Sequence, residues 1–187
     1  MTNRIATLLI AAAVACPIAG LAATKEEKRE DVREVANATL DRLYKAQPKA
    51  KDAVAKSAGY AVFSNFGMKI FVAGGGSGSG IAVNSKTKKE TFMKMVEVQA
   101  GLGIGVKKFR VIWVFERQSD LDKFINSGWE LGGQATASAK VGGQGQEAFA
   151  GAMSISPGIW LYQLTDEGVA AELTAKGTKY YKDKELN

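Results

Sequence analysis

A strand-length stretch in which every second residue is glycine or alanine most constrains how this chain can fold. In VAGGGSGSGIAV (72–83), Gly74, Gly76, Gly78 and Gly80 alternate with serine or larger residues toward the end of the stretch. Successive side chains of a strand point to opposite faces of the sheet, so one face of this strand is almost bare. Related alternations recur further along the chain, at 101–106 and 133–140. Glycine inside strands marks bends or close backbone approach, so the pattern predicts a tightly curved sheet or a closely covered face.

These glycines do not fit a phosphate-binding loop. The stretch has neither G-x-G-x-x-G nor G-K-[ST], the spacings that bind nucleotide phosphates. Residues 143–148 read G-x-G-x-x-A, but the strand-to-helix context and the acidic residue of a dinucleotide site are missing. Two explanations of the bare faces stay open, namely close packing against the protein's own helices and a groove for a ligand.

The segment after residue 23 predicts an amphipathic helix over residues 25–46. Thr24 and Glu27 have the spacing of a capping box, and Pro48 follows the end of the pattern. An apolar stripe recurs at helical spacing, at Val32, Val35, Ala36, Thr39, Leu40 and Leu43. The opposite face has balanced charges, so we expect the stripe to pack on a sheet and the charges to face solvent.

From residue 57 onward the hydrophobic period changes from helical to two. Several strands are expected here, with one short helix at 120–128 that is capped from within residues 119–122. The predicted fold class is α+β. A curved, Gly-rich, small barrel-like antiparallel sheet within 57–187 is covered by the N-terminal amphipathic helix.

The first 22 residues have the pattern of a secretory signal peptide. Arg4 precedes a short apolar run, and small residues at 20–22 predict cleavage before Ala23. The alternative is a lipoprotein box in which Cys16 is lipidated and retained. We therefore expect a periplasmic protein with one domain, 23–187. It contains no other cysteine, and hence no disulfide.

Composition excludes several classes of chemistry. The chain has no histidine, which rules out serine–histidine and cysteine–histidine catalysis and histidine-containing zinc sites. Ser85 and Lys88 fit the S-x-x-K spacing, but the S-D-N and K-T-G partners are missing. We expect no catalytic residues, no metal and no cofactor. Removal of the signal peptide removes Arg4 and leaves 24 of the 25 Lys+Arg and 19 Asp+Glu, a net charge of +5. A positive net charge suits an anionic membrane or nucleic acid, and export of the protein disfavours nucleic acid.

Two groups of cations near predicted turns are candidates for contact with a membrane. The predicted lipid-binding residues are Lys86, Lys88, Lys89, Lys107, Lys108 and Arg110. Each cation near an anionic membrane surface contributes about 1 kcal/mol of binding free energy. The alternative is that lysines in hairpin turns only keep the protein soluble and protect strand edges.

Five segments of the chain resemble, in their order, the motifs of a known family. They are KSAGYAVF, GGGSGSG, QAGLGIGVKKFRVIWVF, LGGQATASAKVGG and GTKYY. Together they resemble the SYLF-domain family of bacterial envelope proteins and of eukaryotic proteins at actin patches and endocytic membranes. The resemblance covers about residues 53–181 and implies a non-catalytic lipid-binding module. It leaves the lipid unnamed, because the N-terminal phosphoinositide-binding region of eukaryotic members is replaced here by a signal peptide and a charge-balanced helix.

The sequence thus predicts a module of the bacterial cell envelope that binds an anionic phospholipid or a membrane surface. In the predicted mechanism, basic turns attract anionic headgroups, and the apolar or glycine-faced sheet surface accommodates acyl chains. The alternative is a structural or protein-interaction protein of the periplasm with an envelope protein as its partner and no lipid ligand. The sequence does not define an oligomeric state.

Overall fold

A computed structural model describes three helices and ten strands of this chain. The residues that it describes are 23–70, 73–100, 105–131, 140–141, 149–165, 168–169 and 177–187. The helices are α1 (Lys25–Ala46), α2 (Lys49–Lys56) and α3 (Gln118–Ser127). The strands are β1 (Gly59–Ile70), β2 (Ala73–Asn84), β3 (Glu90–Ala100), β4 (Gly105–Phe115), β5 (Trp129–Leu131), β6 (Lys140–Val141), β7 (Met153–Ser156), β8 (Ile159–Thr165), β9 (Gly168–Val169) and β10 (Thr178–Lys182).

Local sequence explains where α1 begins and ends. Thr24 Oγ1 accepts a hydrogen bond from the Glu27 amide at 3.2 Å, and Glu27 Oε2 accepts one from the Thr24 amide at 2.6 Å. This is the predicted capping box, which satisfies amides that the first turn of a helix leaves unpaired. The helix ends at Ala46 with Gln47 as its C-cap, because Pro48 disfavours helical geometry in the residue that precedes it.

The short helix α3 forms as expected, but its predicted cap is wrong. The helix begins at Gln118, Arg117 occupies the N-cap position, and no side chain caps the first turn. Asp120 lies inside that turn, where its Oδ2 is 2.6 Å from Arg117 Nε. An acidic residue in this position still interacts favourably with the positive end of the helix.

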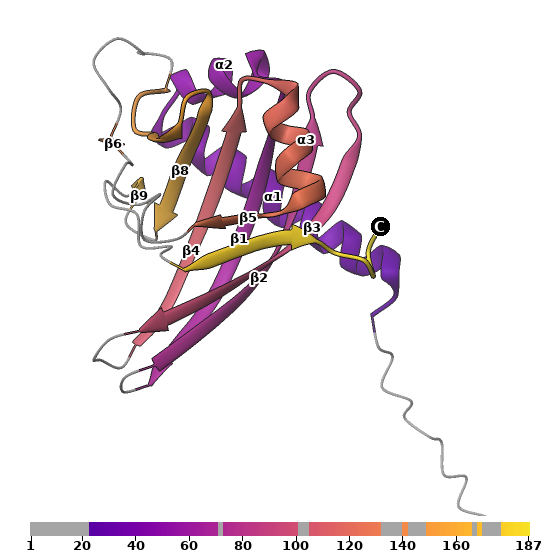
Figure 1. Cartoon of the computed structure of the whole chain (residues 1–187), viewed down its shortest axis with the longest axis vertical. Coiled ribbons are helices and arrows are strands. Elements are labelled where there is room, and N and C mark those ends of the chain that lie inside the picture. Colours follow the sequence, from indigo (N-terminus) through magenta and orange to yellow (C-terminus); the bar gives the residue numbers. More distant parts are fainter. Residues whose placement is uncertain are drawn as a thin grey trace, which may run out of the picture.

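All ten described strands belong to one antiparallel sheet. Its order is β5-β10-β3-β2-β1-β4-β8-β7-β6, and β9 pairs with β8. Figure 1 shows the sheet curled into a half-barrel, with the β1–β2 and β3–β4 hairpins extending past the helices at one end. The predicted curved antiparallel α+β fold is therefore confirmed. Of the two further alternating stretches, 101–106 lies partly and 133–140 almost wholly outside the described residues.

The sheet has a separate apolar core on each face. α1 and α2 cover one face and α3 covers the other, so that α1 lies behind the sheet and α3 in front of it in Figure 1. The α1-side core includes Leu40, Leu43, Val54, Val62, Ile81, Ile112, Trp160 and Tyr162. The α3-side core includes Phe63, Met93, Met95, Trp113, Phe115, Leu121, Phe124 and Tyr180.

Two glycines on the bare face of β2, Gly78 and Gly80, pack against the α3-side core. A Cβ atom at Gly80 would overlap the Phe63 ring and the Val62 carbonyl oxygen, and one at Gly78 would lie 2.8 Å from Met95 Cγ. Phe63 and Met95 are fully buried. Packing is thus the right explanation at these positions, although neighbouring strands, rather than helices, supply the side chains that meet the glycines. The predicted use of this glycine face for acyl chains is wrong here, because the space is already filled.

Candidate functional site

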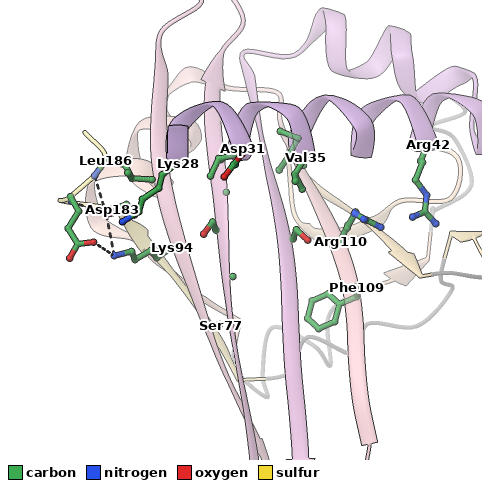
Figure 2. Close-up of a pocket in the computed structure, with 18 residues that line it drawn as sticks. Lys28, Asp31, Val35, Arg42, Ser77, Lys94, Phe109, Arg110, Asp183 and Leu186 are labelled. Atoms are coloured by element: carbon green, nitrogen blue, oxygen red, sulfur yellow. Dashed lines mark hydrogen bonds and ion pairs between the residues drawn. The ribbon is translucent and has the colours of Figure 1, made fainter. Parts of the chain in front are cut away.

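A row of small and charged residues crosses the α1 side of the sheet and forms the floor of a groove. Arg110 on β4 lies opposite Ser64 on β1, Ser64 lies opposite Ser79 on β2, and Ser79 lies opposite Lys94 on β3. The neighbouring row is apolar and buried, and consists of Ile112, Val62, Ile81 and Phe92. Serine is too short to fill the space up to α1. A groove of about 820 Å³ therefore lies between this floor and the helix (Figure 2).

The roof of the groove is the N-terminal half of α1. Val32 and Val35 line the groove, and Val35 is still 39% exposed. Further along the same stripe, Leu40 and Leu43 are buried in the α1-side core. The sequence predicted that the whole stripe packs on the sheet, but only its C-terminal half does so fully. The physical reason is that the sheet opposite Val35 offers serine instead of a large apolar side chain.

The two ends of the groove differ in charge. At one end, Lys94 Nζ lies 3.3 Å from Asp183 Oδ1 and 3.2 Å from Glu185 Oε2. The hydrogen bond to Glu185, together with Asp183, raises the pKa of Lys94. At the other end lie the guanidinium groups of Arg42 and Arg110, and Arg42 Nη2 donates to the Thr165 carbonyl oxygen at 3.1 Å. Among the described lining residues, the Arg42–Arg110 end thus has two cations without a carboxylate, whereas Lys94 at the other end is paired with carboxylates.

Polar contacts fasten the N-terminal half of α1 across the groove. Arg29 Nε donates to the Leu186 carbonyl oxygen at 2.7 Å, and Arg33 Nε pairs with Glu90 Oε2 at 2.9 Å. Both guanidinium groups lie over the Phe92 ring, at 5.6 and 5.3 Å from its centroid. The bond to Glu90 also raises the pKa of Arg33. The helix therefore bridges the groove, held by apolar packing at one end and by charged contacts at the other.

Exposed large hydrophobic side chains gather on the same side of the sheet. Within the described residues these are Val35, Val96 and Tyr181, which are 39%, 39% and 36% exposed. Val96 lies opposite Ser77, a groove residue, and Tyr181 lies opposite Lys94, so both share the face that α1 partly covers. Lys179 lies opposite Val96 and adds a cation to this face. We call Val35, Val96 and Tyr181 the groove rim.

The structure separates the six predicted lipid-binding cations into three places. Lys86, Lys88 and Lys89 are exposed in the β2–β3 turn. The backbone of Lys107 and Lys108 lies in β4 opposite β1, and Lys108 is in register, through Phe66, with Ser77. Ser77 is seven residues from the turn at Asn84, which is roughly 23 Å at about 3.3 Å per residue.

Of the six, only Arg110 lies in the groove among the side chains that the structure describes. Arg42, Lys28 and Lys94 also line the groove, although none of them is among the six predicted residues. A usable signal was present, because Ser64, Ser77 and Ser79 alternate with larger residues or glycine. These serines lie on the face of β1 and β2 opposite to the glycines.

Hydrogen bonds hold the β2–β3 turn in one shape. Asn84 Oδ1 accepts from the amides of Lys86 and Thr87 at 3.0 and 2.8 Å. Lys88 adopts a positive φ of 58°, a conformation that non-glycine residues rarely occupy. The three lysines are therefore presented on a structured turn at the end of the sheet.

The described residues form a groove with apolar and charged surface, and they do not form a metal centre. They contain no group of three or more Cys, Asp or Glu side chains placed to hold a metal ion. None of the described helices is long and apolar enough to cross a membrane. The described residues thus form a small α+β domain in which a helix bridges a groove in a curled sheet.

Comparison with known proteins identifies the family. Residues 96–187 match the Ysc84 family, described as "Las17-binding protein actin regulator". The chain is 34% identical over 165 residues to beta cell expansion factor A of Aeromonas veronii. The aligned region covers 87% of this chain and 60% of that protein. The chain belongs to the Ysc84 (SYLF) domain family, as its motifs indicated. Domains of this family are in general non-catalytic binding modules.

Proposed function

We propose that this protein is a non-catalytic lipid- or membrane-surface-binding module of the bacterial cell envelope. It acts in the periplasm after removal of its signal peptide. The observation that carries the proposal is the groove rim, where exposed apolar side chains lie beside cations. Monomeric proteins seldom gather exposed apolar groups on one face without an interaction that uses them.

The rim residues suit the boundary between water and lipid. Tyrosine presents an apolar ring with a polar tip, and lysine can place its charge among headgroups while its stem contacts apolar atoms. Lys28 and Lys179 lie beside the rim. Each cation near an anionic surface adds about 1 kcal/mol, so the exposed turn of Lys86, Lys88 and Lys89 contributes further attraction.

Co-sedimentation with vesicles tests the proposal. The purified protein is mixed with phosphatidylglycerol-containing vesicles and with purely zwitterionic vesicles, at low and moderate salt. We expect salt-sensitive binding to the anionic vesicles only, since screening weakens attraction between exposed charges. Replacing Val35, Val96 and Tyr181 together with serine should abolish the binding that remains at moderate salt.

Charge variants separate the contributions of the basic groups. Lys86, Lys88 and Lys89 changed to glutamine should flatten the salt dependence, and so should the pair Lys107 and Lys108 in a second variant. Lys123→Gln, an exposed lysine on α3 at the opposite face, is the matched control. Absence of binding to either kind of vesicle would refute the proposal and would favour a protein-interaction role in the envelope.

A further inference from the structure

We infer that the groove beneath α1 binds one long-chain fatty acid, with its carboxylate at Arg42 and Arg110 and its chain under Val35 and Val32. This inference deepens the lipid-binding function proposed above and rests on it. It adds a distinct state, in which a single amphiphile lies inside the protein instead of the protein lying on a membrane.

Two arginines converge on one corner of the groove. Arg110 on β4 lies opposite Leu164 on β8, and Arg42 donates to the carbonyl oxygen of the next residue, Thr165. Figure 2 shows both guanidinium groups at the same end, beneath α1. Like charges repel at close range, and an anion held between them removes that repulsion. The planar fork of a guanidinium group matches the two oxygens of a carboxylate.

The acidic residues that the structure describes in the groove lie away from this corner. Asp183 and Glu185 pair with Lys94 at the opposite end, and Asp31 lies between Lys28 and Val35 in Figure 2. The described lining therefore has cations without carboxylates at one end and carboxylates at the other. An amphiphile with an anionic head is oriented by this difference, with its head at the arginine corner.

The dimensions of the groove match one acyl chain. The floor from Arg110 to Lys94 spans three strand spacings, roughly 14 Å at about 4.8 Å each. The hydrocarbon core of a bilayer is about 30 Å thick for two layers of chains, so one chain spans roughly 15 Å. The volume of about 820 Å³ also lies within the usual range of ligand pockets.

An occupant would also cover apolar surface that the folded chain leaves in water. Val35 is 39% exposed and Val32 is half-buried, and both line the groove. Burial of their methyl groups against an acyl chain is favourable in proportion to the apolar area removed from water. A short carboxylate such as acetate gains only the arginine contacts, so a long chain is the preferred ligand.

Displacement of a fluorescent fatty acid from the purified protein tests this site. We expect oleate to displace the probe, and oleyl alcohol, which has the same chain without the charge, to do so at least tenfold more weakly. Arg110→Gln should lower the affinity for oleate by roughly tenfold, the effect of losing one charge-assisted contact, and should leave oleyl alcohol unchanged. Lys123→Gln on the opposite face should match the unaltered protein.

A second variant tests the cavity without changing its charge. Ser79 lies on the groove floor in β2, where phenylalanine is a favoured strand residue. Ser79→Phe should abolish oleate binding, with an unchanged circular dichroism spectrum as the check on folding. Equal affinity for oleate and oleyl alcohol, effective competition by acetate, or undiminished oleate binding by Ser79→Phe would each overturn the inference.

Vesicle binding by the same proteins separates this inference from the proposed function. Oleate binding without any vesicle binding would refute the membrane-surface role and support the groove site. Vesicle binding without any oleate binding would support the surface role and overturn the groove site.

Discussion

The most direct test of the fold is the substitution Gly80→Ala in β2. The new methyl group would overlap the Phe63 ring and the Val62 carbonyl oxygen. Phe63 cannot easily move, because it is fully buried and its ring packs edge-on against Tyr180, with centroids 4.8 Å apart. Relief of the overlap therefore requires a shift of the β1 backbone or of the aromatic cluster.

The expected loss of stability from Gly80→Ala follows from two opposing effects. Overpacking of a filled core costs about 1 to 3 kcal/mol, and overlap with a backbone oxygen places this site in the upper part of that range. Replacement of glycine by alanine restricts the unfolded chain and returns about 0.4 to 1 kcal/mol. We expect a net loss of about 1 to 2 kcal/mol in the free energy of unfolding.

Gly75→Ala, in the same strand, is the matched control for Gly80→Ala. Its Cβ would lie 3.4 Å from the Glu97 carbonyl oxygen, an ordinary contact, and Gly75 is exposed. Urea unfolding followed by tryptophan fluorescence measures both variants, because Trp113 and Trp160 report on the two opposite cores. Equal stability of the two variants, or a Gly80→Ala protein as stable as the unaltered chain, would refute the packing argument.

Four further substitutions probe other parts of the structure. Leu43→Ala, at a fully buried position in α1, should lower the free energy of unfolding by about 2 to 5 kcal/mol, whereas Val35→Ala should change it by less than about 0.5 kcal/mol in urea titrations. Burial raises the pKa of Tyr162 to about 12, above the value near 10 expected for the unfolded chain. The folded state then resists ionisation, so its stability is retained below about pH 10 and falls between about pH 10 and 12. Tyr162→Phe should make that fall shallower in unfolding curves recorded across this range. Asn84→Ala should cost about 1 kcal/mol, because two amides of the β2–β3 turn lose their acceptor, and faster hydrogen exchange of those amides would report it.

Much of the architecture was predictable because its signals are local. The capping box of Thr24 and Glu27 and the proline after α1 depend on neighbours within four residues, and α1 forms over the predicted range Lys25–Ala46. The change of hydrophobic period from helical to two likewise predicted the strands of the sheet. The predicted cap of α3 is wrong, because the helix begins at Gln118 and Asp120 in its first turn pairs with the N-cap residue Arg117. Both Asp and Ser are common helix caps, so composition alone does not decide which residue begins the helix.

The groove was not predictable because it depends on register across four strands. Arg110, Ser64, Ser79 and Lys94 come from separate strands and become one row only through the pairing of β4, β1, β2 and β3. A shift of one residue in any pair would turn a strand's other face toward α1. The contact of Lys94 with Asp183 joins residues that are far apart in the chain, and no local sequence pattern predicts it.

The alternation in β2 explains both the filled core and the groove. On the α3 side, Gly78 and Gly80 face large neighbours, because Met95 and Phe63 come from the adjacent strands. On the α1 side, Ser79 lies opposite another small residue, Ser64, and none of the described side chains fills the space below Val35. Small residues therefore create a tight contact where their neighbours are large and a hollow where their neighbours are small.

This difference predicts opposite tolerance to substitution at adjacent positions. A larger side chain at Gly80 enters occupied space and must displace protein atoms, whereas one at Ser79 enters the groove. Ser79→Phe should thus retain nearly the full free energy of unfolding and lose ligand binding, and Gly80→Ala should lose stability. If Ser79→Phe were as destabilising as Gly80→Ala, the groove would have to be closed in solution, and the arginine corner would not be accessible to a fatty acid.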